Sequence, residues 1–176
     1  KHLIGYGLIK ESSDGYVFNV EMISNLLKTK YLYQRIDIST EEKVQEISKR
    51  RNVIEKKLRT IIKNSTRLKY GKKANEKVLG AIALPRREKL SNDINVLLSE
   101  SESPLFFLEL INIIKKEWED CFKNIFSQGK DHIVFILNEI NGIGRPDAHA
   151  KGIKKDDFIQ LRLHFDKVES ELDEWF

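Results

Sequence analysis

The sequence predicts an all-α fold, an antiparallel helical bundle with a small β-hairpin and helix in front of it. After position 39, apolar residues recur every three or four positions, as they do on the buried face of an amphipathic helix. Glycines, prolines and capping residues divide this region into segments of helix length. Residues typical of strands gather only at positions 16–20. We therefore expect two domains, residues 1–36 and 37–176.

The first predicted domain begins with a hairpin. Residues 12–15 (Ser-Ser-Asp-Gly) are a tight-turn signal, and residues 16–20 (Tyr-Val-Phe-Asn-Val) favour a strand. Apolar residues at helical spacing follow: Met22, Ile23, Leu26 and Leu27. A hairpin followed by a helix resembles the wing and last helix of a winged-helix module, so we expect residues 1–36 to be a remnant of one.

A long helix is predicted from position 40 to position 70. Ser39 and Glu42 have the spacing of a capping box, and Gly71 provides a stop. The stripe that faces the core is narrow: Val44, Ile47, Arg51, Ile54, Leu58, Ile61 and Leu68. Because the rest of the segment is basic or polar, we expect this helix to lie on the surface of the bundle.

Three helices are predicted in the middle of the chain. Residues 74–84 form the first, and Pro85 opens a second that runs to position 98. Ser103 and Pro104 provide the N-cap and first turn of a third, residues 105–126. Its apolar face is the widest in the chain, which predicts the central helix of the core.

Two further helices complete the predicted bundle. Asp131 caps the first of them, and Asp156 begins the second. Their apolar residues have helical spacing: Ile133, Val134, Ile136, Leu137 and Ile140, then Phe158, Leu161, Phe165, Val168 and Leu172.

Composition excludes several classes of protein. Of the 176 residues, 40% are hydrophobic and 33% charged, which is typical of a folded globular chain. Cys121 is the single cysteine, so a disulfide framework and a multi-cysteine zinc site are excluded, and a reducing, cytoplasmic location is expected. No apolar run approaches the roughly 18 residues of a membrane span. The sequence does not begin with Met, and we interpret it as a piece of a longer protein.

The net charge of +4 conceals a basic segment. Residues 43–89 contain 16 Lys and Arg against 4 Asp and Glu. Two interpretations are open: a surface that binds phosphate, or a helix whose charges complement the acidic C-terminal segment. Tyr70 is the only aromatic residue there, so phosphate contact is favoured over base stacking. The candidate nucleic-acid-binding residues are Lys49, Arg50, Lys56, Lys57, Lys63, Lys69, Lys72 and Lys73.

A short motif lies between the last two predicted helices. Residues 141–150 read Asn-Gly-Ile-Gly-Arg-Pro-Asp-Ala-His-Ala. His149 titrates near neutral pH and is suited to general acid–base chemistry, whereas Arg145 is suited to binding phosphate. Together they are candidates to activate a ribose hydroxyl and to stabilise a phosphorane-like transition state. No phosphate loop and no zinc or calcium ligand spacing is present, so neither cofactor nor metal is predicted.

Structural roles for these residues are open as well. Asp147 is suited to an N-cap, Arg145 to an ion pair with Glu139, and His149 to a hydrogen bond in the core. Arg162 and His164 follow on the last helix, where spacing alone does not orient them. Cys121 lies between Trp118 and Phe122 and is expected to be a buried small hydrophobe.

A helical bundle with Asn-Glu-Ile, then Arg-Pro-Asp-Ala-His-Ala, before its last helix resembles the HEPN superfamily, most of all over residues 133–165. His149 matches the family histidine and Arg145 the arginine. Three residues separate them, whereas the family has four to six. The resemblance implies a metal-independent endoribonuclease with RNA as substrate and a homodimer through the last helices.

Together with the winged-helix remnant, the same resemblance implies the C-terminal part of a bacterial STAND or AAA ATPase used in antiviral defence. Its NTPase domain would then be a partner in the same chain, with no membrane involved. The alternative is a non-catalytic assembly or sensing module that binds a partner protein or nucleic acid. The glycine at position 144, where the family pattern would place its arginine, favours that alternative.

Overall fold

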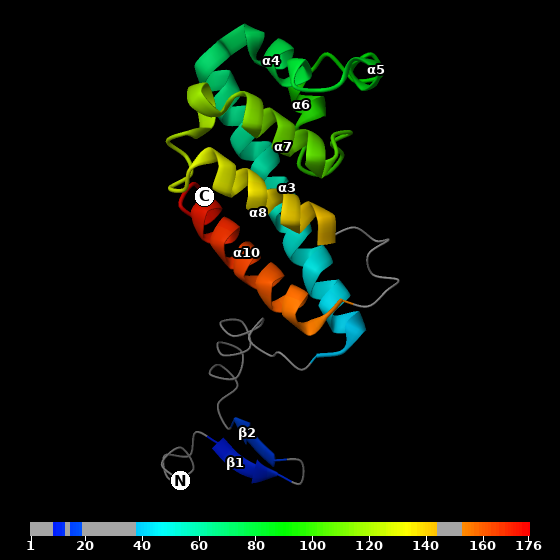
Figure 1. Ribbon diagram of the computed structural model, residues 1–176, viewed down its shortest axis with the longest axis vertical. Coiled ribbons are helices and arrows are strands. Elements are labelled where there is room, and N and C mark those ends of the chain that lie inside the picture. The colour runs from blue at the N-terminus through cyan, green and yellow to red at the C-terminus, as the bar shows by residue number, and fades with distance from the viewer. Residues whose placement is uncertain (1–8, 13–14, 19–37, 144–152) are drawn as a thin grey trace. The chain divides into compact units, whose positions relative to one another are not determined.

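A computed structural model describes residues 9–12, 15–18, 38–143 and 153–176 (Figure 1). The chain separates into two compact units, Lys1–Ile38 and Ser39–Phe176. The prediction set this boundary at residue 36. Seven α-helices lie in the described part of the second unit, and two strands lie in that of the first.

The first unit contains a pair of short strands. β1 (Ile9–Ser12) and β2 (Gly15–Phe18) are antiparallel, with Ile9 opposite Phe18. Gly15 has a φ of 120°, which residues with a side chain rarely adopt. The turn and the helix predicted in this unit lie outside the described residues, and the winged-helix remnant therefore stays a prediction.

The long helix α3 (Thr40–Tyr70) has the bounds that its caps predict. The Ser39 N–H donates to Glu42 Oε2 at 2.8 Å, and the Glu42 N–H donates to Ser39 Oγ at 3.2 Å. The helix ends at Gly71, whose φ is 55° and ψ −122°. Both the capping box and the glycine stop are confirmed.

The helices that follow are shorter than predicted. They are the 3-10 helix η1 (Gly71–Lys73), α4 (Ala74–Gly80), α5 (Leu84–Arg87) and α6 (Ile94–Leu97). The helix predicted from Pro85 to position 98 is wrong, because it is interrupted between α5 and α6. The Asp93 side chain accepts a hydrogen bond from the Asn95 N–H at 2.8 Å and thereby starts a new turn instead of continuing the old one.

The predicted core helix at residues 105–126 is also interrupted. α7 (Phe107–Lys116) is followed by the π-helix η2 (Trp118–Phe122), in which the Lys123 N–H donates to the Trp118 carbonyl at 2.9 Å. Trp118 and Phe126 are nonetheless buried, with stacked rings 5.8 Å apart. The apolar spacing thus predicted which side chains are buried, whereas the wider π-turn decided how the backbone reaches them.

The last two helices, α8 (Lys130–Ile143) and α10 (Lys155–Asp173), confirm the prediction for their positions. α10 packs against both α8 and α3. Glu46 of α3 bonds to Arg162 of α10, and Lys57 bonds to Asp173, so the residue numbers rise together along the pair. α3 and α10 are therefore parallel, and an entirely antiparallel bundle is wrong. α8 runs in the opposite direction beside α10 (Figure 1).

One side of α3 faces the core of the second unit, where it packs against α4, α7, η2 and α10. The other side, which carries Lys49 and Lys56, is exposed, as predicted for a helix at the surface of the bundle. The apolar stripe is narrow because charged residues share the buried face, among them Glu46, Arg50 and Arg59. Paired charges therefore widen the buried surface of α3 beyond what its apolar residues indicate.

Candidate functional site

The basic residues of α3 divide between an inner and an outer face. Arg50 lies inside, only 2% exposed, and donates to Glu169 Oε1 from Nε at 2.9 Å and to Asp166 Oδ1 from Nη2 at 2.5 Å. Lys57 forms an ion pair with Asp173. For these two residues the structure supports the second interpretation of the basic segment, that its charges complement the acidic C-terminal helix.

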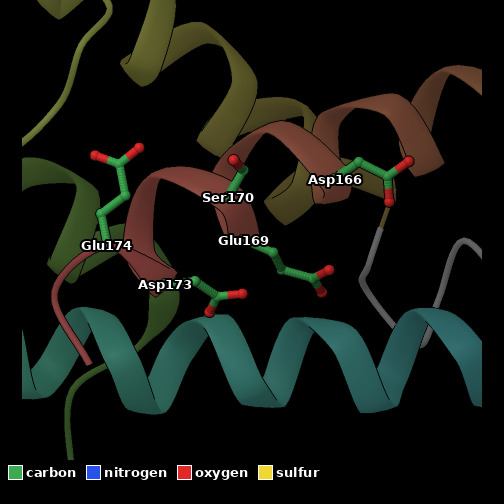
Figure 2. A pocket seen from close by; sticks show the side chains of 5 residues that line it. All are labelled: Asp166, Glu169, Ser170, Asp173 and Glu174. Carbon is green, nitrogen blue, oxygen red and sulfur yellow. The ribbon is translucent and has the colours of Figure 1, made fainter. Parts of the chain in front are cut away.

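An open depression of about 490 Å³ lies along this contact, lined by Asp166, Glu169, Ser170, Asp173 and Glu174. Figure 2 shows Glu169 and Asp173 directed towards α3 and Glu174 directed away from it. Glu169 already forms an ion pair with Arg50 of α3, and Asp173 forms one with Lys57. Within the described residues, no group of three or more His, Cys, Asp or Glu is placed to hold a metal ion. The depression is therefore the outer edge of the helix contact.

α3 and α10 also share a buried ion pair that the sequence patterns did not predict. Arg162 donates from Nε to Glu46 Oε1 at 2.7 Å, and both residues are 7% exposed. A signal was available, because Glu46 and Arg50 are four residues apart and face Arg162 and Asp166, also four apart, with the charges reversed. Arg162 thus serves the contact between α3 and α10.

His164, the other candidate on the last helix, turns towards α8. Its ring meets the Phe135 ring edge to face, with centroids 5.9 Å apart. The imidazole therefore packs between the last two helices and makes an aromatic contact there.

Three lysines of α3 face solvent at intervals of seven residues. Lys49 and Lys56 are exposed and Lys63 is half-exposed, and none has an ion pair among the residues that the structure describes. Seven residues are about two turns, so the three lie on one side of the helix at intervals of about 10 Å. We call Lys49, Lys56 and Lys63 the lysine stripe.

A carboxylate lies beside the lysine stripe. Glu100 Oε1 accepts a hydrogen bond at 2.7 Å from Thr60 Oγ1, and Thr60 lies between Lys56 and Lys63 in the sequence. This carboxylate weakens the positive potential at the middle of the stripe but leaves three cations against one anion. The stripe is therefore suited to a polyanion and not to a single small anion.

The remaining predicted nucleic-acid contacts are at the C-terminal end of α3. Lys69 lies 3.0 Å from Asp120 Oδ1, and its hydrogen bond and charge hold the pKa of that carboxyl below its usual value. Lys72 and Lys73 are exposed in η1. Of the eight candidates, Arg50 is thus buried, Lys57 and Lys69 are ion-paired, and the others face solvent.

Arg145, Asp147 and His149 lie outside the described residues. The helices on either side of the motif are described, and α8 ends at Ile143 while α10 begins at Lys155. Near the end of α8, buried Asn141 accepts a hydrogen bond at 3.5 Å from Arg51 of α3. The motif therefore leaves α8 close to the N-terminal half of α3.

Cys121 belongs to a polar cluster at the end of α3. Tyr70 donates its hydroxyl proton to buried Glu117 at 2.5 Å, and burial together with this bond raises the pKa of Tyr70. Burial raises the pKa of the half-buried Cys121 thiol as well. Both groups are protonated near neutral pH, which makes Cys121 a poor nucleophile. The expectation of a buried small hydrophobe is wrong, because Cys121 is half-buried beside polar groups.

Comparison with known proteins leaves the family open. No family model matches the chain, and no solved structure matches it. The chain is similar to uncharacterized protein MJ0903 of Methanocaldococcus jannaschii, with 26% identity over 126 residues, which cover 66% of this chain and 19% of that protein. The chain thus spans about a fifth of the length of this relative. No helix in the described ranges is both long and apolar enough to cross a bilayer.

Proposed function

We propose that the helical unit binds RNA through the lysine stripe and is a HEPN-type, metal-independent endoribonuclease. The observation that carries the proposal is the exposure of Lys49, Lys56 and Lys63 on one side of α3 without ion-pair partners in the described part of the chain. Regularly spaced ammonium groups suit the repeated phosphates of a nucleic-acid strand. Tyr70 is the only aromatic residue within α3 itself and lies outside the stripe, which favours backbone contact over recognition of bases.

The chemistry is assigned to the motif between α8 and α10. His149 takes the proton of a ribose 2′-hydroxyl, whose oxygen then attacks the adjacent phosphorus. The 5′-oxygen of the next nucleotide leaves and takes a proton from the now protonated imidazole of His149, and a cyclic phosphate remains on the ribose. Arg145 stabilises the charge on the non-bridging oxygens during this displacement. No metal takes part in this scheme.

The arrangement of the helices supports joining the stripe to the motif. α8 ends, and α10 begins, beside the N-terminal half of α3, as the contacts Arg51–Asn141 and Glu46–Arg162 indicate. Lys49 is the stripe residue nearest to these contacts along α3. A strand bound along the stripe would therefore be directed towards the motif.

Cleavage of end-labelled RNA in EDTA tests the catalytic part. We expect the chain to cut RNA, and we expect H149A and R145A each to abolish cleavage. H149A should leave RNA affinity unchanged, whereas R145A should also weaken it by the loss of one phosphate contact. Far-ultraviolet circular dichroism establishes that the variants are folded. Cleavage that survives either substitution, or that requires an added divalent cation, would contradict the assignment.

RNA affinity tests the lysine stripe by itself. The triple variant K49Q/K56Q/K63Q should bind RNA at least about tenfold more weakly and with a smaller dependence on salt, since up to three phosphate contacts are lost. K89Q/K115Q/K130Q is the matched control, because it removes the same charge from two exposed lysines and one half-exposed lysine elsewhere that also have no ion pair in the described part of the chain. Equal losses in the two variants would mean that net charge, and not the stripe, determines binding.

A non-catalytic assembly module is the second candidate, with a second copy of this chain as the partner. Phe135 of α8 is 54% exposed and Leu163 of α10 is 62% exposed, and these are the two helices through which the resemblance implies a homodimer. A dimer by light scattering that F135S/L163S converts to a monomer, without RNA cleavage by either protein, would favour this candidate. The NTPase partner and the role in antiviral defence stay predictions.

A further inference from the structure

A polar hollow of about 450 Å³ lies beside α4 in the second unit. It is lined by Lys72, Asn75, Glu76, Leu79, Arg87 and Asn92. The first four have the spacing i, i+3, i+4, i+7 and so share one side of η1 and α4. The other two come from α5 and from the segment before α6. The hollow shares no residue with the lysine stripe or with the motif between α8 and α10.

Arg87 is fixed in the wall of this hollow. Its Nη2 donates to the Gly80 carbonyl at 3.2 Å and to the Ile82 carbonyl at 3.0 Å. Its Nε is buried without a hydrogen-bond partner, and no carboxylate of the described residues forms an ion pair with it. A held guanidinium with a free buried donor and no counter-ion favours an anionic acceptor.

Asn75 gives the lining of the hollow a second polar group without a partner. Asn75 donates from Nδ2 to Asn92 Oδ1, which fixes the orientation of its amide, and Asn75 Oδ1 is left buried without a partner. A carbonyl oxygen of this kind requires a donor such as a hydroxyl. Lys72 is exposed beside it and has no ion pair in the described ranges, while Glu76 contributes one negative charge. The lining is therefore net positive, with one free donor and one free acceptor.

We infer that this hollow binds a phosphate group carried by a sugar with free hydroxyls. The phosphate satisfies Arg87 Nε and the Lys72 ammonium, and a sugar hydroxyl donates to Asn75 Oδ1. Inorganic phosphate alone supplies the anion but lacks the sugar. A ribose phosphate, free or within an RNA strand, supplies both groups. This inference does not depend on the proposed function.

Titration with uridine 5′-monophosphate, followed through the side-chain amide resonances of Asn75 and Asn92, tests the inference. We expect saturable shifts at both amides, with weaker binding of inorganic phosphate. K72Q should weaken binding about tenfold, as the loss of one charge-assisted hydrogen bond implies. K73Q is the matched control, because Lys73 is its exposed neighbour in η1 and does not line the hollow. It should leave the affinity within about twofold.

Two further variants and a second ligand complete the test. N75D should weaken binding further, because a carboxylate there repels phosphate; R87Q is less informative, since Arg87 also holds two backbone carbonyls. Shifts with a short RNA but not with the nucleotide would assign the source of the phosphate to a strand. Absence of saturable shifts with both ligands, or equal weakening by K72Q and K73Q, would overturn the inference.

Discussion

Arg50 of α3 and Glu169 of α10 form a bidentate ion pair across two parallel helices, with Nε–Oε1 at 2.9 Å and Nη2–Oε2 at 2.5 Å. The guanidinium is nearly fully buried and also lies over the Phe165 ring, 4.9 Å from its centroid. Burial opposes the charged form of Arg50, but the hydrogen bonds and charges of Glu169 and Asp166 outweigh it and raise the pKa. The Arg50 guanidinium thus joins the basic helix α3 to the acidic helix α10, and its burial leaves it inaccessible to a ligand.

Removing this cation should destabilise the bundle. R50M keeps an unbranched chain about as long as the aliphatic part of arginine but removes the cation that pairs with Glu169 and lies beside Glu46. We expect a loss of about 2 kcal/mol in the free energy of unfolding. The loss is smaller than for a wholly enclosed pair, because the Glu169 side chain is 24% exposed and regains water. Urea unfolding measures the difference.

The control for R50M is K49M. Lys49 is the preceding residue of the same helix but faces solvent, so its replacement should change the free energy of unfolding by less than about 0.5 kcal/mol. Similar losses for the two variants would mean that the Arg50 ion pairs contribute nothing beyond the general charge of α3.

The stability of the bundle should depend on pH through the Glu171 carboxyl. Its Oε2 accepts from the Ser127 N–H at 2.6 Å and its Oε1 accepts from the Ser127 hydroxyl, which joins α10 to the segment before α8. Burial of the carboxyl acts to raise its pKa, but the bonds from Ser127 and Lys167 outweigh burial and lower it. The stabilisation is therefore complete above the ordinary glutamate pKa of 4.5 and is lost as pH falls through the lowered value.

The variant E171Q checks this dependence. At pH 7 it should be less stable than the original chain by about 1–2 kcal/mol, because a charge-assisted bond becomes a neutral one. The difference should shrink as the pH is lowered below 4.5. A difference that is constant from pH 7 to pH 3 would show that the lowered pKa contributes nothing to stability.

Gly71 should be required where α3 ends. Its φ of 55° and ψ of −122° are costly for any residue with a Cβ, although an added Cβ would meet no atom within 4 Å. We expect G71A to lower the free energy of unfolding by about 1 kcal/mol through backbone strain alone.

G142A is the matched control for this prediction. Gly142 lies within α8, and a Cβ there also meets nothing within 4 Å, so alanine should be neutral or stabilising by up to about 1 kcal/mol. The midpoint temperature of thermal unfolding should therefore fall in G71A and stay the same or rise in G142A. Equal shifts would contradict a strained end for α3.

Local signals predicted the ends of α3 and the positions of α8 and α10. Ser39, Glu42 and Gly71 act through bonds and backbone angles within a few residues, so their effect can be predicted without knowledge of the fold. The same reasoning failed between positions 85 and 126. There, Asp93 restarts a helix, and Glu117 turns inward to meet Tyr70 of a distant helix.

The candidate site was predictable only in part. Charge counting found the basic segment, but it did not separate Arg50 from Lys49, which are adjacent in sequence and opposite in burial. No pattern in the sequence indicates that Arg87 Nε and Asn75 Oδ1 lack partners, because a buried atom is unpaired only once its surroundings are packed.

The sequence by itself therefore determined the helical class, the ends of the helices with local caps and the basic character of residues 43–89. Tertiary structure alone decided that α3 and α10 are parallel and which cations face inward. The physical reason is the distance along the chain over which each kind of interaction acts. Caps and periodicity act over one or two turns, whereas Arg50 meets Glu169 across 119 positions of the chain, a contact that depends on how all the intervening helices pack.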